Sequence, residues 1–278
     1  MNDSDPRTVS KPTPVLPALM EIRVAQGKQL PGILLNTIPK SGSIYLANAF
    51  CRGLGIPFMR ISGSWFPVDT VVSEQLAKLA QGNAVTQEHL DANSPNRLAL
   101  GNVLDRFVVH LRDPRMTALE SVHHMMTEKE LNGIEALRSS VVPEFCPPDF
   151  FEMSMTERIG HHVDHMLPAV IQWVEGWLDA SEAPTFRPKI LFTRYEDMVR
   201  DEVGFLNAIL DFYEIERSQF TFVPFQPAMN EQADIEGEFH FRNARTDEWR
   251  EAFTDEQIDT ACGMMPQRLL ERFGWPER

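Results

Sequence analysis

Cysteine is scarce in this chain, and long apolar runs are missing. The 278 residues include three cysteines, an odd number without Cys-x-x-Cys spacing, which excludes a disulfide-stapled scaffold and a zinc or redox motif of paired cysteines. No window approaches the roughly 18 uninterrupted apolar residues that a membrane span needs. The segment Met1–Arg23 is polar and proline-rich and lacks the apolar stretch of a signal peptide. We therefore expect a cytoplasmic protein that does not insert into membranes.

Positive charge is also in short supply. The chain has 26 Lys plus Arg against 40 Asp plus Glu, which gives a formal net charge of −14. Such a bulk charge is repelled by nucleic acid and by anionic lipid at long range. We expect no nucleic-acid partner, and any small anion that this protein binds has to be held by a local cluster of positive groups.

The chain divides into a proline-rich start and a patterned remainder. Residues 1–31 are expected to be a tail or a loosely docked arm, because proline removes backbone donors and fixes φ. From residue 32 to residue 278, short apolar segments alternate with longer helical patterns, which is typical of crossover units. The sequence therefore predicts an α/β domain with a central, mostly parallel sheet flanked by helices.

The expected strands are Ile33–Thr37, Phe58–Ser62, Ala84–Gln87, Arg106–Leu111 and Lys189–Thr193. The expected helices are Ser43–Leu54, Val68–Ala80, Pro114–Met126 and Thr156–Ala180. Residues 128–151 contain several prolines and no sustained period, so they are expected to form an irregular lid or binding loop.

A candidate anion-binding loop directly follows the first expected strand. The run Pro39-Lys40-Ser41-Gly42-Ser43 leads into a helical pattern, and such a turn directs free backbone N–H groups and the positive end of the helix dipole at one point. Lys40 adds a full charge, Gly42 permits close backbone approach, and Ser43 adds a hydroxyl donor. The same run could also be an ordinary surface turn. It is not a Walker A loop, because here Lys precedes Ser-Gly.

At this loop the chain resembles the sulfotransferases that use 3′-phosphoadenosine 5′-phosphosulfate (PAPS), whose phosphosulfate loop reads Pro-Lys-Ser-Gly-Thr-Thr-Trp. Pro39, Lys40, Ser41 and Gly42 match. The resemblance implies a single P-loop-like domain, PAPS as donor cosubstrate without a metal, and a catalytic Lys40. The substituted positions of the donor-binding loop are Ser43, which keeps a hydroxyl, Ile44, which loses one, and Tyr45.

His89 follows another expected strand, within the run Thr86-Gln87-Glu88-His89-Leu90. The carboxyl ends of strands are where open α/β folds bind their ligands. An imidazole has an unperturbed pKa of about 6.5, which suits proton transfer near neutral pH. A lone His can equally be a structural hydrogen-bonding group. The resemblance implies that His89 is the general base that takes the proton of the acceptor hydroxyl.

Arg112 ends a further expected strand, in the run Arg112-Asp113-Pro114. The resemblance implies that Arg112 binds the 3′-phosphate of the donor. The family has a Ser eight residues later as a second ligand, but Glu120 stands there and Ser121 follows it. Adjacent helix positions point about 100° apart, so Ser121 does not replace the missing group without a shift in register. Either Glu120 turns away, or the donor site is altered.

Two further segments carry the resemblance. Arg194-Tyr195-Glu196-Asp197 is similar to the Arg-Tyr-Glu-Asp segment of the family, and it either fixes a strand-to-helix corner or lets Tyr195 or Arg194 line the nucleotide cleft. Near the C-terminus, Arg242 matches an Arg-Lys-Gly loop, which implies a second contact to the 3′-phosphate. Asn243 replaces the Lys of that loop and Ala244 replaces its Gly.

These motifs together favour a sulfotransferase that moves a sulfuryl group to a hydroxyl, or in second place an amine, of a small-molecule acceptor. Two alternatives stay open. One is a nucleotide-dependent kinase of the same architecture, with Asp113 holding magnesium, and the other is a degenerate nucleotide-binding protein without turnover. The sequence leaves the acceptor and the oligomeric state open.

Overall fold

Four parallel strands form the centre of the molecule. The computed structural model describes residues 29–64, 66–222 and 244–278. Within these ranges the sheet has the order β2-β1-β3-β4. The strands are β1 (Ile33–Thr37), β2 (Val85–Glu88), β3 (Arg106–Leu111) and β4 (Lys189–Arg194). All three pairings are parallel, which confirms the predicted α/β fold with a parallel sheet.

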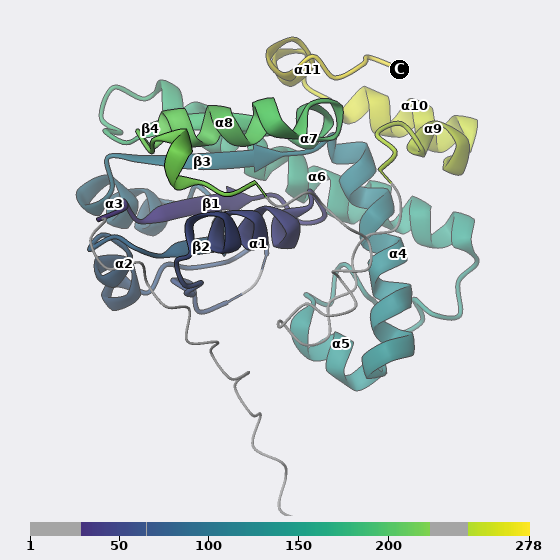
Figure 1. Ribbon diagram of the computed structural model, residues 1–278. Helices are drawn as coiled ribbons and strands as arrows, with labels where there is room; N and C mark the ends of the chain where they lie inside the picture. Colours follow the sequence, from purple (N-terminus) through teal and green to yellow (C-terminus); the bar gives the residue numbers. More distant parts are fainter. Residues whose placement is uncertain (1–28, 65, 223–243) are drawn as a thin grey trace, which may run out of the picture.

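Both faces of the sheet are covered, which explains why its strands are apolar almost throughout. Side chains alternate between the two faces along each strand. In β1, Leu34 belongs to one buried apolar cluster and Leu35 to the other. In β3, Val109 lies in the first cluster and Val108 in the second. The sheet is therefore the middle layer of three, with helices on both sides (Figure 1).

Helices α1 (Ser43–Leu54), α7 (Tyr195–Arg200) and α8 (Glu202–Phe212) contribute to the cluster on the Leu35 face. The remaining helices contribute to the cluster on the Leu34 face, and the two longest of them, α4 and α6, pack against each other. These helices are α2 (Ser73–Leu79), α3 (Ser94–Val103), α4 (Pro114–Asn132), α5 (Ile134–Ser140), α6 (Met155–Glu182), α9 (Trp249–Ala252), α10 (Asp255–Met264) and α11 (Gln267–Phe273). Among the helices of the described ranges, none is long and apolar enough to cross a membrane.

Several segments differ from the sequence-based expectation. The helix expected at Val68–Ala80 begins only at Ser73, and helices α7 to α11 have no counterpart among the expected helices. The expected strand Phe58–Ser62 makes only isolated bridges, because the N–H of Ile61 donates to the Glu88 carboxylate at 2.6 Å instead of to a neighbouring strand. The expected irregular segment 128–151 is largely helical in its first half, since α4 continues to Asn132 and α5 follows. Helix α3 was not expected; it begins at an Asn93 cap with proline in its first turn.

The chain after residue 244 docks through a buried arginine at the start of α4. Arg115 is fully buried and forms an ion pair with Asp113 at 2.7 Å. Its guanidinium lies 4.2 Å from the centre of the Trp249 ring and donates to the Pro276 carbonyl at 2.7 Å. These contacts fix the C-terminal helices next to the carboxyl end of β3.

Tyr213, just after α8, completes the hydrogen bonding of β1. Its buried hydroxyl accepts from the Leu34 N–H at 3.0 Å and donates to the Leu34 carbonyl at 2.9 Å. The pairing of β1 with β3 begins only at Leu35, so the hydroxyl takes the place of a strand partner. Burial raises the pKa of the Tyr213 hydroxyl, which therefore stays protonated as a donor.

We predict that Tyr213→Phe lowers the free energy of unfolding by about 1–3 kcal/mol, because two buried backbone groups lose their partner while the ring still packs. Urea denaturation measures this value, and an unchanged m-value shows that the two proteins expose the same surface area on unfolding. A variant as stable as the wild type would mean that water or another group replaces the hydroxyl.

Candidate functional site

The strand order sets a topological switch point between β1 and β3, where an open α/β sheet has its ligand crevice. The chain moves from β1 to β2 on one side and then crosses back to β3 on the other side of β1. In open α/β sheets, ligands bind outside the carboxyl ends of the strands at such a reversal. The loop of residues 38–42 leaves the end of β1, and Arg112 follows the end of β3. The two predicted anion-binding segments therefore meet at this point.

The loop after β1 has a tight left-handed shape. Lys40 has φ 62° and Gly42 has φ 79°, and Gly42 caps the N-terminus of α1 without a side-chain hydrogen bond. The backbone N–H groups of Ser41, Gly42, Ser43 and Ile44 have no acceptor among the residues that the structure describes. Four donors at a helix N-terminus form a favourable place for an anion.

Two side chains of the neighbouring strand segment orient this loop. Arg112 donates to the Lys40 carbonyl at 2.7 Å, and His110 Nε2 lies 2.9 Å from the Ser41 carbonyl. In a trans peptide the C=O and the following N–H point in opposite directions. Holding these two carbonyls against β3 therefore turns the N–H groups of Ser41 and Gly42 away from the strand, toward the crevice.

His110 is a residue that sequence reasoning missed. It is fully buried within β3, and its Nδ1 lies 2.9 Å from the Thr193 hydroxyl. The Ser41 carbonyl can only accept, so Nε2 carries the proton and Nδ1 accepts from Thr193. Burial lowers the pKa of His110 to about 4, so the ring is neutral at physiological pH. The only sequence signal was a polar residue in an otherwise apolar strand.

The remaining loop residues serve different purposes. The Ser41 hydroxyl donates to the Ile38 carbonyl at 2.7 Å, so only its backbone N–H is available to a ligand. Ser43 is buried at the helix start, while Pro39 and Ile44 are half-buried. Tyr45 turns toward α8, where its hydroxyl donates to the Glu202 carboxylate.

Tyr195 supports both parts of the crevice. It is buried at the start of α7, and the Arg112 guanidinium lies 4.2 Å from the centre of its ring. The same ring borders the loop, since a Cβ added to Gly42 would lie 3.3 Å from a Tyr195 ring carbon and 3.0 Å from Met198. Arg194 and Glu196 act at the corner instead: Arg194 pairs with Asp197 at 2.7 Å, and Glu196 accepts from the Asp113 N–H at 2.9 Å.

Glu120 lies beside Arg112 and does not turn away. Its Oε1 is 3.1 Å from Arg112 NH2, and both side chains are buried. Ser121 is buried as well, but the contact to Arg112 comes from Glu120. Arg112 NH2 also donates to the Arg245 carbonyl at 2.9 Å, whereas Arg112 Nε has no acceptor within the described part of the chain.

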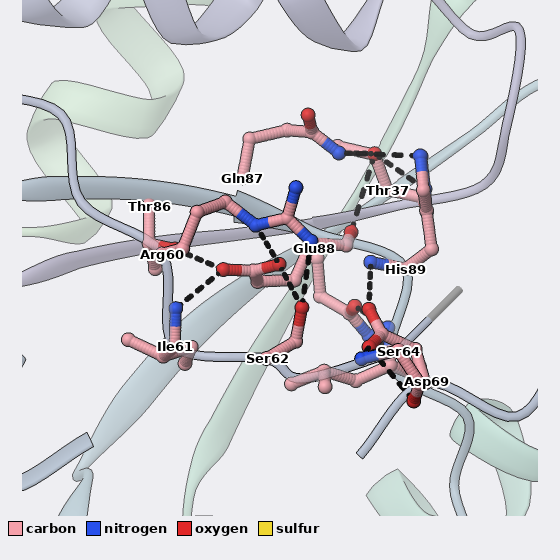
Figure 2. A network of polar contacts seen from close by, with 12 residues as sticks. Thr37, Arg60, Ile61, Ser62, Ser64, Asp69, Thr86, Gln87, Glu88 and His89 are labelled. Atoms are coloured by element: carbon pink, nitrogen blue, oxygen red, sulfur yellow. Dashed lines mark hydrogen bonds and ion pairs between the residues drawn. The ribbon is translucent and has the colours of Figure 1, made fainter. Parts of the chain in front are cut away.

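His89 stands at the end of β2, on the other side of β1. Its Nδ1 is 2.6 Å from the Thr37 carbonyl, which can only accept, so Nδ1 carries the proton and Nε2 is left with its lone pair. The Gln87 amide nitrogen lies 3.5 Å from Nε2 and donates to the Thr37 hydroxyl at 2.9 Å. His89 thus has the tautomer of a general base, and Figure 2 shows it against Thr37.

Burial lowers the pKa of His89 to about 4. The Thr37 carbonyl and the Asp69 carboxylate oppose this shift, while the positive charges of Lys40 and Arg60 add to it. The ring is therefore neutral, and able to accept a proton, at every pH well above 4.

A buried carboxylate shapes the chain around His89. Glu88 accepts from the Ile61 N–H at 2.6 Å, the Ser62 hydroxyl at 2.5 Å and the Thr86 hydroxyl at 2.7 Å, and it pairs with Arg60 at 3.0 Å. Figure 2 shows these contacts converging on one carboxylate. Asp69 accepts from the His89 N–H at 3.3 Å, which holds the backbone next to this network. Nothing in the spacing of these residues marks them in the sequence.

The other predicted site residues lie outside the described ranges, at their edge, or in contacts of the fold. Arg242 and Asn243 lie outside the described residues, and Ala244 is exposed. Asp113, the magnesium ligand of the kinase alternative, is instead the N-cap of α4 and the partner of Arg115. No group of three or more His, Cys, Asp or Glu that could hold a metal is found in residues 29–64, 66–222 and 244–278.

Comparison with known proteins gives one family. The sulfotransferase domain model matches residues 30–271. The crystal structure of mouse sulfotransferase SULT7A1 complexed with PAP is similar, with 18% identity, a TM-score of 0.55 and 88% of each chain covered. A sulfotransferase from Alicyclobacillus acidocaldarius is 11% identical over 87% of this chain and 99% of its own, with a TM-score of 0.44. No curated protein matches the sequence significantly.

We predict that Gly42→Ala destabilises the protein more than Gly55→Ala. Both glycines have positive φ at the two ends of α1, so both changes cost about 1–2 kcal/mol in backbone strain. A Cβ at Gly55 meets nothing within 4 Å, whereas at Gly42 it meets Met198 and Tyr195. The collision adds about 1–3 kcal/mol.

Urea denaturation of the two variants measures the difference. Equal losses of stability would show that the Tyr195 and Met198 side chains move aside without cost.

Proposed function

The chain belongs to the sulfotransferase family, and from that premise we propose that it moves a sulfuryl group from PAPS to a hydroxyl, or in second place an amine, of a small-molecule acceptor. The observation that carries this proposal is the arrangement at the end of β1. There the anion-binding loop with Lys40 lies between Arg112, after β3, and the neutral His89, after β2. A cation, free N–H donors and a base at one sheet edge suit transfer of a charged group between two oxygens.

The described residues fit the donor in two places. The N–H groups of Ser41 and Gly42 point away from β3, and together with those of Ser43 and Ile44 they offer a phosphosulfate four donors that have no acceptor among the described residues. Arg112 offers the 3′-phosphate its Nε–H, which has no acceptor within the described part of the chain. Arg242, outside the described residues, is the second proposed ligand of that phosphate. The donor supplies the sulfuryl group.

His89 and Lys40 have complementary roles in the transfer. The acceptor oxygen forms a bond to sulfur while the bond from sulfur to the phosphate oxygen breaks. His89 Nε2 takes the acceptor proton, because its lone pair is free of a proton in this tautomer. Lys40 neutralises the charge that develops on the phosphate oxygen, as preorganised cations do in phosphoryl transfer.

Mass spectrometry of an acceptor panel incubated with PAPS tests the proposal. A sulfated product, with a mass increase that depends on PAPS, supports it. Phosphorylated product in a parallel incubation with ATP and magnesium would instead support the kinase alternative. A rise in melting temperature with 3′-phosphoadenosine 5′-phosphate, without any product from the panel, would favour a nucleotide-binding protein without turnover.

We predict that Lys40→Ala lowers the rate of sulfuryl transfer at least about 100-fold, since charge on the leaving oxygen is no longer neutralised. Lys40 is half-buried at the rim of the loop, so the fold should stay intact. Product formation is followed by mass spectrometry, and the far-ultraviolet circular dichroism spectrum is the control. Near-normal turnover would remove Lys40 from the mechanism.

We also predict the pH dependence of kcat/KM. The base must be neutral, and the lowered pKa keeps His89 neutral down to about pH 4. Activity should therefore persist through pH 5 to 6 and fall only as pH approaches 4, and His89→Asn should be inactive throughout. Circular dichroism at each pH confirms that the protein is folded. An acidic limb near the ordinary imidazole value of about 6.5 would contradict this environment for His89.

A further inference from the structure

Glu120 is a buried acid at the place where the proposed function puts a phosphate. It lies in α4, eight residues after Arg112, and is 8% exposed. Its Oε1 contacts Arg112 NH2 at 3.1 Å, with the two side chains 9% and 4% exposed. This is a close, desolvated ion pair, in which each charge is much more strongly felt than at the surface.

Arg112 cannot move away from Glu120 without breaking its other contacts. Its NH1 donates to the Lys40 carbonyl at 2.7 Å and its NH2 to the Arg245 carbonyl at 2.9 Å. Its plane lies over the Tyr195 ring at 4.2 Å. The guanidinium is therefore fixed from three sides, and Glu120 stays beside any ligand group that Arg112 binds.

A fixed carboxylate affects a phosphate and a hydroxyl in opposite ways. A phosphate monoester has a charge near −2 and only accepts hydrogen bonds, so Glu120 repels it and already occupies a donor of Arg112. A ribose hydroxyl carries no charge and donates to a carboxylate, which is how acidic residues select a free ribose hydroxyl in dinucleotide sites. Moving Glu120 aside would separate two opposite charges that are both buried, which is costly.

We propose that Glu120 is a specificity-determining residue that reduces the preference of this site for a nucleotide with a 3′-phosphate over the same nucleotide with a 3′-hydroxyl. This proposal rests on the proposed function, because it takes Arg112 as part of the nucleotide site. The site accepts both kinds of nucleotide with comparable affinity, and this tolerance depends on the charge of Glu120.

Isothermal titration calorimetry with two probes tests it. Adenosine 5′-phosphate and 3′-phosphoadenosine 5′-phosphate are titrated into the full-length wild type, Glu120→Gln and Glu120→Ser. Glu128→Gln is the matched control, since Glu128 lies on the same helix and pairs with His124 instead. Glu120→Gln keeps the size of the side chain, so it gives a result even if the Ser variant does not fold.

We expect the two affinities of the wild type to lie within about tenfold of each other, which is about 1.4 kcal/mol. Both Glu120 variants should raise the ratio in favour of the 3′-phosphate at least about tenfold, mainly by tighter binding of the phosphorylated probe. Glu128→Gln should leave the ratio unchanged.

The outcomes separate this inference from the proposed function. If both probes bind but neither Glu120 variant changes the ratio, the inference is overturned and the proposed function stands. If both affinities change by the same factor, Glu120 has a structural effect only, which also overturns the inference. If neither probe binds the wild type or any variant, the nucleotide site itself is overturned, and the inference with it.

Discussion

The candidate site depends on two hydrogen bonds that β3 and the residue after its end make to the loop after β1. His110 and Arg112 hold the carbonyl oxygens of Ser41 and Lys40. Because C=O and N–H oppose each other across a trans peptide, these bonds decide where the donors of the loop point. The same strand order that forms the crevice brings these partners together. The sheet topology and the geometry of the candidate site therefore both depend on β3 lying next to β1.

Much of the fold could be predicted from local pattern. The bounds of β1, α1 and β3 were correct, because each is an apolar or amphipathic run between clear turn residues. The strand expected at Phe58–Ser62 was wrong, since a side chain takes the N–H of Ile61 that a strand neighbour would need. Helix α3 was missed because its sequence, SPNRLALGNV, has few apolar residues to mark a period.

The candidate site could be predicted from the sequence only where a charged or titratable residue follows directly after a strand. Lys40, His89 and Arg112 stand at strand ends, and the structure brings their segments to one edge of the sheet. Residues that only position other residues are not marked by such a pattern in the sequence. His110 could not be separated from an ordinary core residue, and the pairing of Glu120 with Arg112 depends on the phase of α4 against β3.

The bonds that shape the loop have a consequence for how the protein is made. His110 and Ser41 are 69 residues apart, Arg112 and Arg245 are 133 apart, and the Tyr195 ring comes from beyond β4. Contacts between distant parts of a chain form late in folding. A nascent chain that has left the ribosome only as far as β3 therefore carries the Pro-Lys-Ser-Gly run without its Tyr195 support. The proposed anion binding should thus emerge during synthesis only after α7 has docked, as a property of the whole domain.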